Sequence, residues 1–152
     1  MNNIAIKKIT NYSEFHSNFL KKVYLSNNFE EDTKEGNETF IDFVSVEKSK
    51  KRITEGSCFY ELIIDRNSIG IFEVDENHLS LLFIGNEFQK KGMGIFCIET
   101  IKFVLKNDYS ELTVFASPYS LDFYLKNGFI KQSEDKKMIK GMNYYPMSLK
   151  LK

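Results

Sequence analysis

Short runs rich in apolar, β-branched and aromatic residues recur in the first half of the chain, bounded by polar turns, and such runs are typical of strands. A weak alternation opens the sequence and three β-rich runs follow a helical region, so strands are predicted at residues 4–9, 58–64, 69–74 and 78–84. The polar turns at residues 65–68 and 75–77 separate the last three runs. Turns this short connect antiparallel neighbours, so the first half of the sheet is predicted to be antiparallel.

Apolar positions spaced by three or four residues predict two helices before the second strand. The first begins at Ser13, and the second is predicted at about residues 37–52, after a polar and acidic segment. The apolar positions at helical spacing are Phe15, Phe19 and Val23 in the first helix, and Phe40, Val44 and, as a third candidate, Ile41 in the second.

Helical periodicity returns after Gly92 and Gly94, and a shorter helix follows it, with Ser117 placed as its N-cap and Gly128 as its left-handed C-terminal cap. The apolar stripe of the longer helix consists of Cys97, Ile98, Ile101, Val104 and Leu105. Strands are predicted at about residues 112–116, 129–134 and 142–149, the last two flanking a lysine-rich turn.

These elements predict an α/β (α+β) fold with one mixed, mostly antiparallel central sheet of six to seven strands and helices on both faces. A strand-helix-strand unit is expected around Gly92. No linker or internal repeat interrupts the sequence, so a single domain over residues 1–152 is predicted.

Charge and composition narrow the possible partners. Lys plus Arg and Asp plus Glu both number 21, so no net field attracts nucleic acid or an anionic membrane. No apolar run has the length of a signal-peptide core or a membrane span, and we expect a cytoplasmic protein. The two cysteines and two histidines stand apart from one another, so no metal site is expected. Frequent Lys and Asn beside few Arg are typical of an AT-rich bacterial genome.

The segment Gln89-Lys90-Lys91-Gly92-Met93-Gly94 joins the end of a strand to the start of an amphipathic helix. Glycine allows backbone conformations in which successive N–H groups point at one anion, and a helix N-terminus adds free N–H groups and the positive end of its dipole. The spacing fits neither the G-x-x-x-x-G-K-[ST] loop for nucleoside triphosphates nor the dinucleotide loop G-x-G-x-x-G. A phosphate loop of the form Q-x-x-G-x-G remains.

This Q-x-x-G-x-G pattern resembles the acyl-coenzyme-A pyrophosphate loop of the GNAT N-acetyltransferase superfamily. The strand before it agrees, because the aliphatic residue Ile84 stands five positions before Gln89. Residues 117–129, Ser-Pro-Tyr-Ser-Leu-Asp-Phe-Tyr-Leu-Lys-Asn-Gly-Phe, resemble the second signature of the superfamily, a short helix that carries Tyr and ends in Gly-Phe. The resemblance extends over roughly residues 56–150.

The resemblance implies that acetyl-coenzyme A (acetyl-CoA) is the acyl donor. The strand before the loop is expected to pair with the pantetheine arm of the cofactor, and the loop to hold its pyrophosphate by backbone N–H groups. The residues implied are Leu82, Phe83 and Ile84 for the pantetheine arm, Gln89, Lys90, Lys91, Gly92, Met93 and Gly94 for the pyrophosphate, Lys126 for the 3′-phosphate, and Ser117, which stands where the family often has Asn.

For catalysis, the resemblance implies that Tyr124 is the general acid that protonates the departing sulfur of coenzyme A, a role that suits a phenol at neutral pH. His78 and Glu73 are alternative bases for the amine, and ordered water is a third route. The expected reaction is direct transfer of an acetyl group to a primary amine in a ternary complex. A non-catalytic sensor that binds coenzyme A is the alternative.

The acceptor stays open between a small-molecule amine and a peptide amine. In the superfamily, the acceptor pocket is built by the segment between the first two helices and by the last strand pair. These regions here are acidic and aromatic, respectively, and contain Glu30, Glu31, Asp32 and Glu35, and Tyr144, Tyr145 and Pro146. A monomer or homodimer is expected.

Overall fold

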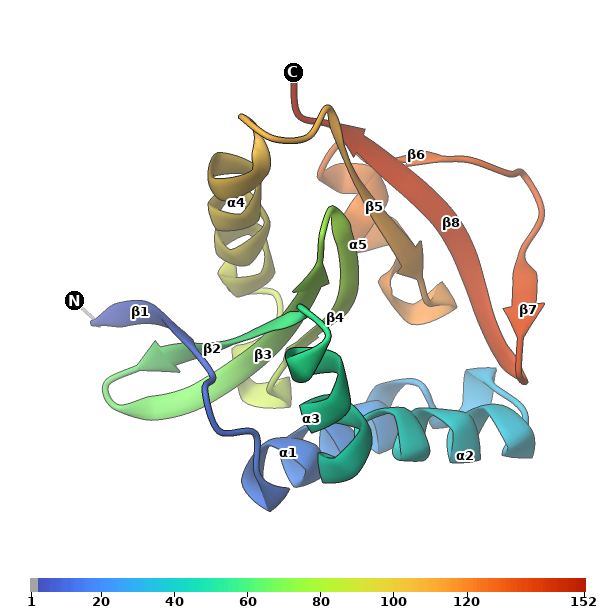
Figure 1. The fold of residues 1–152 in the computed structure, drawn as a ribbon. Helices are drawn as coiled ribbons and strands as arrows, with labels where there is room; N and C mark the ends of the chain where they lie inside the picture. The colour runs from blue at the N-terminus through green and yellow to red at the C-terminus, as the bar shows by residue number, and fades with distance from the viewer. Residues whose placement is uncertain (1–2) are drawn as a thin grey trace.

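The computed structural model describes residues 3–152, which form one sheet of eight strands flanked by five α-helices (Figure 1). The strands are β1 (Ile4–Lys8), β2 (Cys58–Ile64), β3 (Asn67–Asp75), β4 (His78–Ile84), β5 (Glu111–Ala116), β6 (Ile130–Lys131), β7 (Lys137–Ile139) and β8 (Met142–Lys150). The helices are α1 (Glu14–Asn27), α2 (Lys34–Phe43), α3 (Val46–Thr54), α4 (Met93–Leu105) and α5 (Leu121–Lys126), with the short 3-10 turns η1 (Phe29–Glu31), η2 (Asn86–Phe88) and η3 (Pro118–Ser120).

The sheet has the strand order β1-β2-β3-β4-β5-β8-β6, and β7 pairs with the first residues of β8. Within residues 3–152, β4 and β5 are the one parallel pair, so the predicted mixed and mostly antiparallel sheet is confirmed. The strand number is eight rather than six to seven. The difference arises at the C-terminal end, where the lysine-rich turn contains β7 and the strand predicted at residues 129–134 is reduced to β6.

The single helix predicted at residues 37–52 is two helices. α2 begins three residues earlier, after Thr33, whose hydroxyl accepts a hydrogen bond from the backbone N–H of Gly36. α3 has its own N-cap, Ser45, whose hydroxyl accepts from the N–H of Lys48, so the chain turns between the two helices. Phe40 and Val44 are buried as predicted, whereas Ile41 is 38% exposed. The inward assignment of Ile41 was therefore wrong, because α2 presents a narrower face to the sheet.

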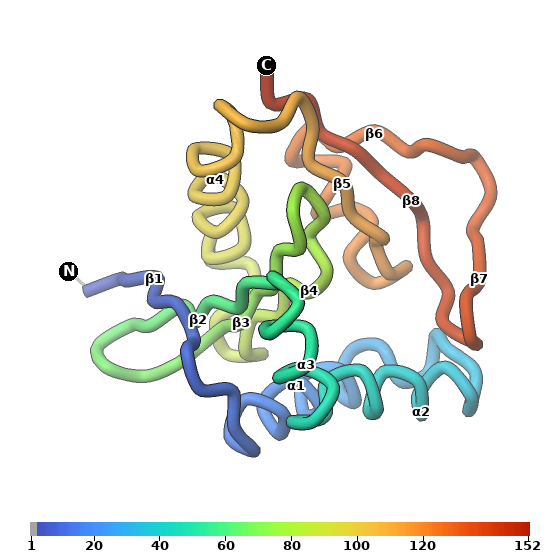
Figure 2. The backbone as a smooth tube through the Cα atoms, in the orientation of Figure 1, coloured from blue at the N-terminus to red at the C-terminus, as the bar shows by residue number. Residues whose placement is uncertain are grey.

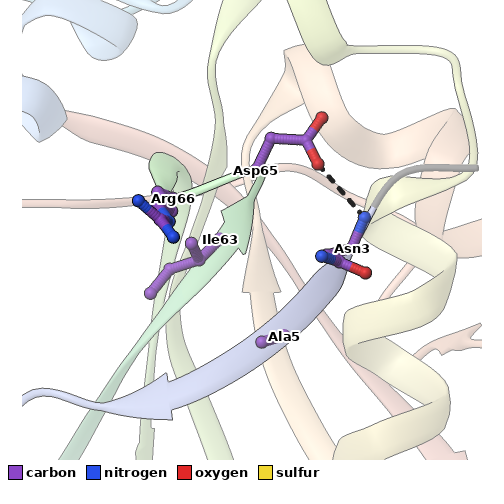
Figure 3. Close-up of a pocket in the computed structure, with 5 residues that line it drawn as sticks. All are labelled: Asn3, Ala5, Ile63, Asp65 and Arg66. Carbon is purple, nitrogen blue, oxygen red and sulfur yellow. Dashed lines mark hydrogen bonds between the residues drawn. The ribbon is translucent and has the colours of Figure 1, made fainter.

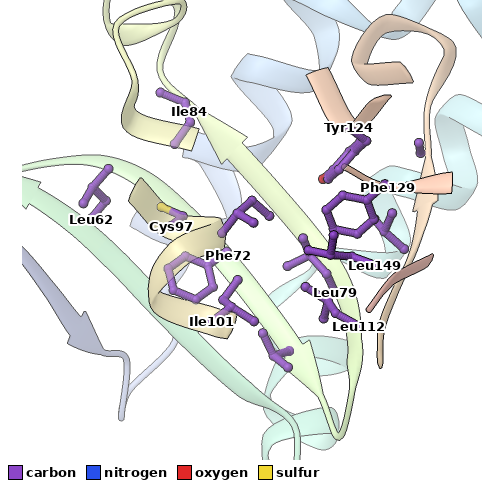
Figure 4. Close-up of a cluster of buried hydrophobic side chains, with 14 of the residues drawn as sticks. Leu62, Phe72, Leu79, Ile84, Cys97, Ile101, Leu112, Tyr124, Phe129 and Leu149 are labelled. Carbon is purple, nitrogen blue, oxygen red and sulfur yellow. The ribbon is translucent and has the colours of Figure 1, made fainter. Parts of the chain in front are cut away.

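Two hydrophobic clusters lie on opposite faces of the sheet. One packs α4 and α5 against β2 to β5 and β8, and it includes Cys97, Tyr124 and Phe129 (Figure 4). The other packs α1 and α2 against the opposite side of β2, β3 and β4. The α4 stripe is confirmed at Cys97, Ile98 and Ile101, but Val104 is 60% exposed and lies outside it.

A β-bulge changes the faces that β4 presents to the two clusters. Leu79 and Ile84 pack under α4 and α5, whereas Leu81 packs under α1 and α2, although regular alternation would place residues 79 and 81 on one face. The register with β3 shifts at this point: Val74 lies opposite Leu79 and Glu73 lies opposite Leu81. The residue between them, Ser80, has no partner on β3 and is the extra residue of the bulge.

The strands β4 and β5 pair only at one end. His78 lies opposite Thr113 and Leu79 lies opposite Val114, and within residues 3–152 the two strands make no further pair. The strands then separate (Figure 1, Figure 2). Residues 80–84 of β4 keep β3 on one side and have an opening on the other, which is where the candidate site lies.

Candidate active site

The opening beside β4 exposes backbone groups of the strand. The carbonyl oxygen of Ile84 accepts a hydrogen bond from Nε2 of Gln89 at 2.9 Å, whereas the next N–H, of Gly85, donates to Ile69 on β3 at 2.7 Å. Ile84 thus directs its peptide groups away from β3, and alternate residues of a strand direct theirs to the same side. Leu82 therefore faces the opening and Phe83 faces β3, so Leu82 and Ile84 are placed to meet a ligand there.

The segment from Gln89 to Gly94 leads directly into α4, and Gly92 is its N-cap residue with φ +84°. Lys90 also has a positive φ, of 59°. Within residues 3–152, the N–H groups from Lys90 to Ile95 have no hydrogen-bond acceptor in the protein. No acidic residue lies in the first turn of α4. Six free N–H groups at the positive end of a thirteen-residue helix form a site suited to a phosphate group.

Glycine is required at two positions of the loop, 92 and 94, for different structural reasons. At Gly92 an added Cβ would meet no atom within 4 Å, so the residue is selected by its left-handed backbone. At Gly94 an added Cβ would lie 2.8 Å from the ring of Phe123 on α5. Gly94 therefore allows α4 and α5 to pack closely, in addition to exposing its N–H group.

The side chain of Gln89 forms hydrogen bonds to two separate segments of the chain. Its Nε2 donates to the carbonyl of Ile84, and its Oε1 accepts a hydrogen bond of 2.6 Å from the hydroxyl of Tyr119 on η3. The backbone N–H of Gln89 is turned toward Asn86, at a long 3.4 Å. The side chain of Gln89 thus connects the end of β4 to the segment that follows β5. Tyr119 was not singled out in the sequence, because nothing local pairs it with Gln89.

Tyr124 on α5 is 4% exposed and packs edge to face against Phe123 and Phe129, with ring centroids 5.1 Å apart in both cases. Its hydroxyl has no hydrogen-bond partner among the described residues. Burial raises the pKa of Tyr124 well above its usual value, and the thiol of Cys97 adds to this. The phenol is protonated at neutral pH and free to donate. Burial also raises the pKa of Cys97, to about 12, so its sulfur remains a thiol.

His78 lies at the end where β4 and β5 still pair. Its Nδ1 is 2.7 Å from the hydroxyl oxygen of Thr113, and its ring meets the ring of Phe115 with centroids 4.6 Å apart. Burial lowers the pKa of His78, although the carboxylates of Asp75 and Glu73 oppose the shift. The imidazole is therefore neutral at pH 7 and stands next to an aromatic ring rather than at the open end of the site.

Glu73 occupies a different environment from the one a base requires. Its side chain is fully buried, and its two oxygens accept hydrogen bonds from Nε and Nη2 of Arg52 at 2.8 and 3.1 Å. Ser57 donates a third bond of 2.6 Å to the same carboxylate. The structure thus argues against Glu73 as a base, because both oxygens are occupied and no substrate reaches them. Arg52, in the last turn of α3, is the partner of Glu73.

The other residues predicted to contact the cofactor are Ser117, Lys126, Lys90 and Lys91. Ser117 caps η3, accepting from the N–H of Ser120 at 3.3 Å, and its hydroxyl also accepts a hydrogen bond of 3.1 Å from Nδ2 of Asn28. Lys126 is exposed at the last turn of α5. Lys90 and Lys91 are exposed on the loop, so their side chains are free to meet a ligand or solvent.

The end of α1 crosses the open end of the site. Nδ2 of Asn27 donates to Oδ1 of Asn86, just after β4, at 3.0 Å, and Nδ2 of Asn28 donates to Ser117, just after β5. The same Nδ2 of Asn28 donates to Oε1 of Glu31 at 2.8 Å. Two adjacent asparagines therefore link the ends of two separated strands and bring Glu31 to this position. Asn27 and Asn28 gave no signal in the sequence, since their partners are 59 and 89 residues away.

The structure also has a cavity away from the β4–β5 opening. A shallow cavity of about 350 Å³ at the β1 edge of the sheet is lined by Asn3, Ala5, Ile63, Asp65 and Arg66 (Figure 3). Over residues 3–152, no three His, Cys, Asp or Glu side chains are grouped as metal ligands. No helix in the same range combines the length and apolar character needed to cross a membrane.

Comparison with solved structures defines the class of this fold. A GCN5-related N-acetyltransferase from Rhodopseudomonas palustris matches with a TM-score of 0.82 at 14% identity, over 96% of this chain and 94% of that one. PaiA N-acetyltransferase from Thermoplasma acidophilum, in complex with coenzyme A, matches with a TM-score of 0.77 at 23% identity, over 97% and 99% of the two chains. The chain thus has the fold of the N-acetyltransferases.

A further match is a GNAT family acetyltransferase from Elizabethkingia anophelis with acetyl-CoA bound, with a TM-score of 0.61 at 16% identity, over 97% of this chain and 98% of that one. A family model described as an acetyltransferase (GNAT) domain matches residues 28–151. The chain belongs to the GNAT acetyltransferase family, and the resemblance carried by the two motifs is confirmed. No curated protein matched the sequence.

Proposed function

We propose that this protein is an N-acetyltransferase that moves an acetyl group from acetyl-CoA to a primary amine by direct transfer in a ternary complex. One observation carries the proposal: six N–H groups without acceptors lie at the start of α4, beside the unpaired edge of β4. Family membership and the coenzyme A and acetyl-CoA named for two related structures support it.

In this proposal the donor lies along the opening between β4 and β5. Its pyrophosphate binds the N–H groups that begin at Lys90, and its pantetheine arm pairs with Leu82 and Ile84, which direct peptide groups into the opening. Lys126 is assigned to the 3′-phosphate. Ser117 is engaged with η3 and Asn28, so its contribution to the cofactor is secondary.

The acetyl transfer then uses Tyr124 as general acid. The amine nitrogen attacks the thioester carbonyl, the C–S bond breaks, and the phenol of Tyr124 protonates the departing sulfur. The raised pKa of Tyr124 keeps the phenol protonated at neutral pH, so the proton is in place when the sulfur departs. Cys97 is buried and protonated, which supports direct transfer without an acyl-cysteine intermediate.

A base must take a proton from the ammonium form of the acceptor. Glu73 is left out of this proposal because Arg52 and Ser57 occupy its carboxylate. His78 stays a candidate base, since its lowered pKa keeps the ring neutral at pH 7. Ordered water that carries the proton away from the amine is the other candidate.

The proposal is tested by measuring coenzyme A binding by calorimetry and thiol release from acetyl-CoA with and without a panel of amines. The expected result is amine-dependent thiol release that drops in Tyr124→Phe while coenzyme A still binds. Tyr60→Phe is the matched control, because Tyr60 is a partly buried tyrosine that stacks on Phe72 in the same hydrophobic cluster but lies on β2, away from the β4–β5 opening. Tight coenzyme A binding without amine-dependent release would instead indicate the non-catalytic sensor.

A further inference from the structure

Glu31 is held at the open end of the site by contacts from the end of α1 and from β8. Its Oε1 accepts from Asn28, whose Nδ2 also donates to Ser117 after β5. Its backbone carbonyl accepts a bond of 2.6 Å from Nδ2 of Asn143 on β8. The next residue, Asp32, accepts bonds from the N–H of Asn143 and the hydroxyl of Tyr24. The η1 segment is thereby fixed across the mouth of the β4–β5 opening.

The Glu31 carboxylate is half-buried and carries a charge that the protein does not neutralise. Among residues 3–152, no Lys, Arg or His side chain forms an ion pair with it, although it is close to the charge of Asp32. Burial raises the pKa of Glu31 and the charge of Asp32 adds to this, whereas hydrogen bonds from Asn28, the backbone of Tyr119 and Ser117 oppose the shift. The donors that face this partly desolvated carboxylate, from Asn28, Tyr119 and Ser117, are all neutral, so its charge can attract a cation from outside the protein.

An aromatic surface adjoins Glu31 on the same side of the sheet. Phe115 and Ser117 are two residues apart on extended backbone, so both side chains face the side on which Asn28 and Glu31 lie. The ring of Phe115 is 4.6 Å from the ring of Tyr144, between centroids, and equally far from the ring of His78. Phe115 is more than half exposed, so these rings are available to a ligand.

We infer that Glu31 is the acceptor-binding carboxylate and proton acceptor, and that the acceptor is a small primary amine whose apolar or aromatic part packs on Phe115 and Tyr144. This inference rests on the proposed acetyl transfer and adds the acceptor class and the base to it. The carboxylate attracts the ammonium group, and the two rings bury the apolar part.

The proton steps balance with the residues named. Glu31 takes one proton from the ammonium group, which leaves a neutral amine. The amine nitrogen forms the new C–N bond, the C–S bond breaks, and the sulfur receives the proton of the Tyr124 hydroxyl. The extra proton on the new amide nitrogen passes to the tyrosinate, which restores the phenol. Glu31 releases its proton to solvent. The products are the N-acetyl amine, coenzyme A and one proton.

Glu31→Gln is the decisive variant, with Glu38→Gln as the control, because Glu38 is an exposed carboxylate on nearby α2. Phenethylamine, ethylamine and a short peptide with a free N-terminus serve as acceptors. Thiol release gives kcat and KM, and calorimetry gives phenethylamine binding to the coenzyme-A-loaded protein. We expect Glu31→Gln to lower kcat/KM for phenethylamine about 100-fold. Wild type should prefer phenethylamine to ethylamine about 10-fold or more, and Phe115→Ala should remove that preference.

The outcomes separate the inference from the proposed function. If wild type turns over amines and Glu31→Gln behaves like Glu38→Gln, the inference is overturned and the proposed function stands. If no amine is acetylated, the proposed function fails, and phenethylamine binding that is weakened only in Glu31→Gln still supports the recognition site. Use of the peptide alone, with no phenethylamine binding or turnover, overturns the small-amine assignment.

Discussion

Arg52→Met measures what the ion pair beneath α3 contributes to stability. In the native protein the guanidinium of Arg52 forms a two-point contact with Glu73 at 2.8 and 3.1 Å. It also donates from Nη1 to the backbone carbonyl of Phe43 at 2.8 Å, and its central carbon lies 3.7 Å from the centre of the Phe43 ring. Met keeps some of the apolar packing on Phe43 and removes every polar contact.

The expected loss follows from burial. Removing one partner of a buried ion pair costs about 3–5 kcal/mol, because the other charge is left without a partner in a poorly hydrated place. The Glu73 side chain is 0% exposed, but Arg52 keeps 22% of its side chain exposed, so the lower end applies. We expect Arg52→Met to lower the free energy of unfolding by about 3 kcal/mol. This is a large fraction of the ~5–15 kcal/mol typical of a domain.

Urea unfolding followed by circular dichroism at pH 7 provides the measurement. Lys48→Met is the control, since Lys48 on the same helix contacts Asp42 at 3.9 Å with both side chains exposed, and its change should stay within about 0.5 kcal/mol. The double variant Arg52→Met with Glu73→Met should be more stable than Arg52→Met alone, because no unpaired charge remains. A loss below about 1 kcal/mol for Arg52→Met would refute this reasoning.

Four further outcomes are expected. Tyr124→Phe should lower kcat about 100-fold with unchanged coenzyme A affinity, measured by thiol release and calorimetry, because it removes the acid alone; an unchanged kcat would exclude that role. Gly94→Ala should lower stability by about 1–3 kcal/mol in urea unfolding and weaken coenzyme A binding, because its Cβ would lie 2.8 Å from Phe123; retention of both contradicts the close packing. Gly36→Ala should lower the Tm in a thermal scan, since its Cβ would overlap the backbone of the β7–β8 turn, and an unchanged Tm would show that the turn yields freely. His78 has a lowered pKa in the folded protein, so it must lose a proton on folding in acid, and the free energy of unfolding should fall as pH drops below ~6.5. Urea unfolding at pH 5 and 7 should show a smaller fall for His78→Gln than for wild type. An equal fall in both proteins would contradict this assignment to His78.

The sequence predicted those parts of the molecule that depend on local spacing. The loop around Gly92, the left-handed Gly128 and the strands up to Ile84 are all specified by residues within a few positions of one another. The same local signal was available at Ser45, where an N-cap residue interrupts the predicted helix at residues 37–52. The break was missed because the apolar positions continue across it.

Contacts between distant residues were beyond the reach of the sequence. Arg52 stands in a lysine-rich run that is typical of a solvated helix end, and only the fold brings it to Glu73, which is 21 residues away. Asn28 and Ser117 are separated by 89 residues. Val104 fits the apolar period of α4, yet it is exposed because no strand or helix covers that part of the helix. Helix periodicity locates an apolar stripe but does not say how wide the facing element is.

The contact between Gly94 and Phe123 makes the two motifs of this family interdependent. A side chain larger than hydrogen at position 94 would have to share space with the Phe123 ring, whose nearest atom lies 2.8 Å from the position of a Cβ. Relatives that carry a larger residue at the position of Gly94 are therefore expected to carry a smaller one at the position of Phe123. The phosphate loop and the tyrosine helix should accordingly vary as a matched pair during evolution, and exchanging either one alone between relatives should impair packing until its partner is exchanged too.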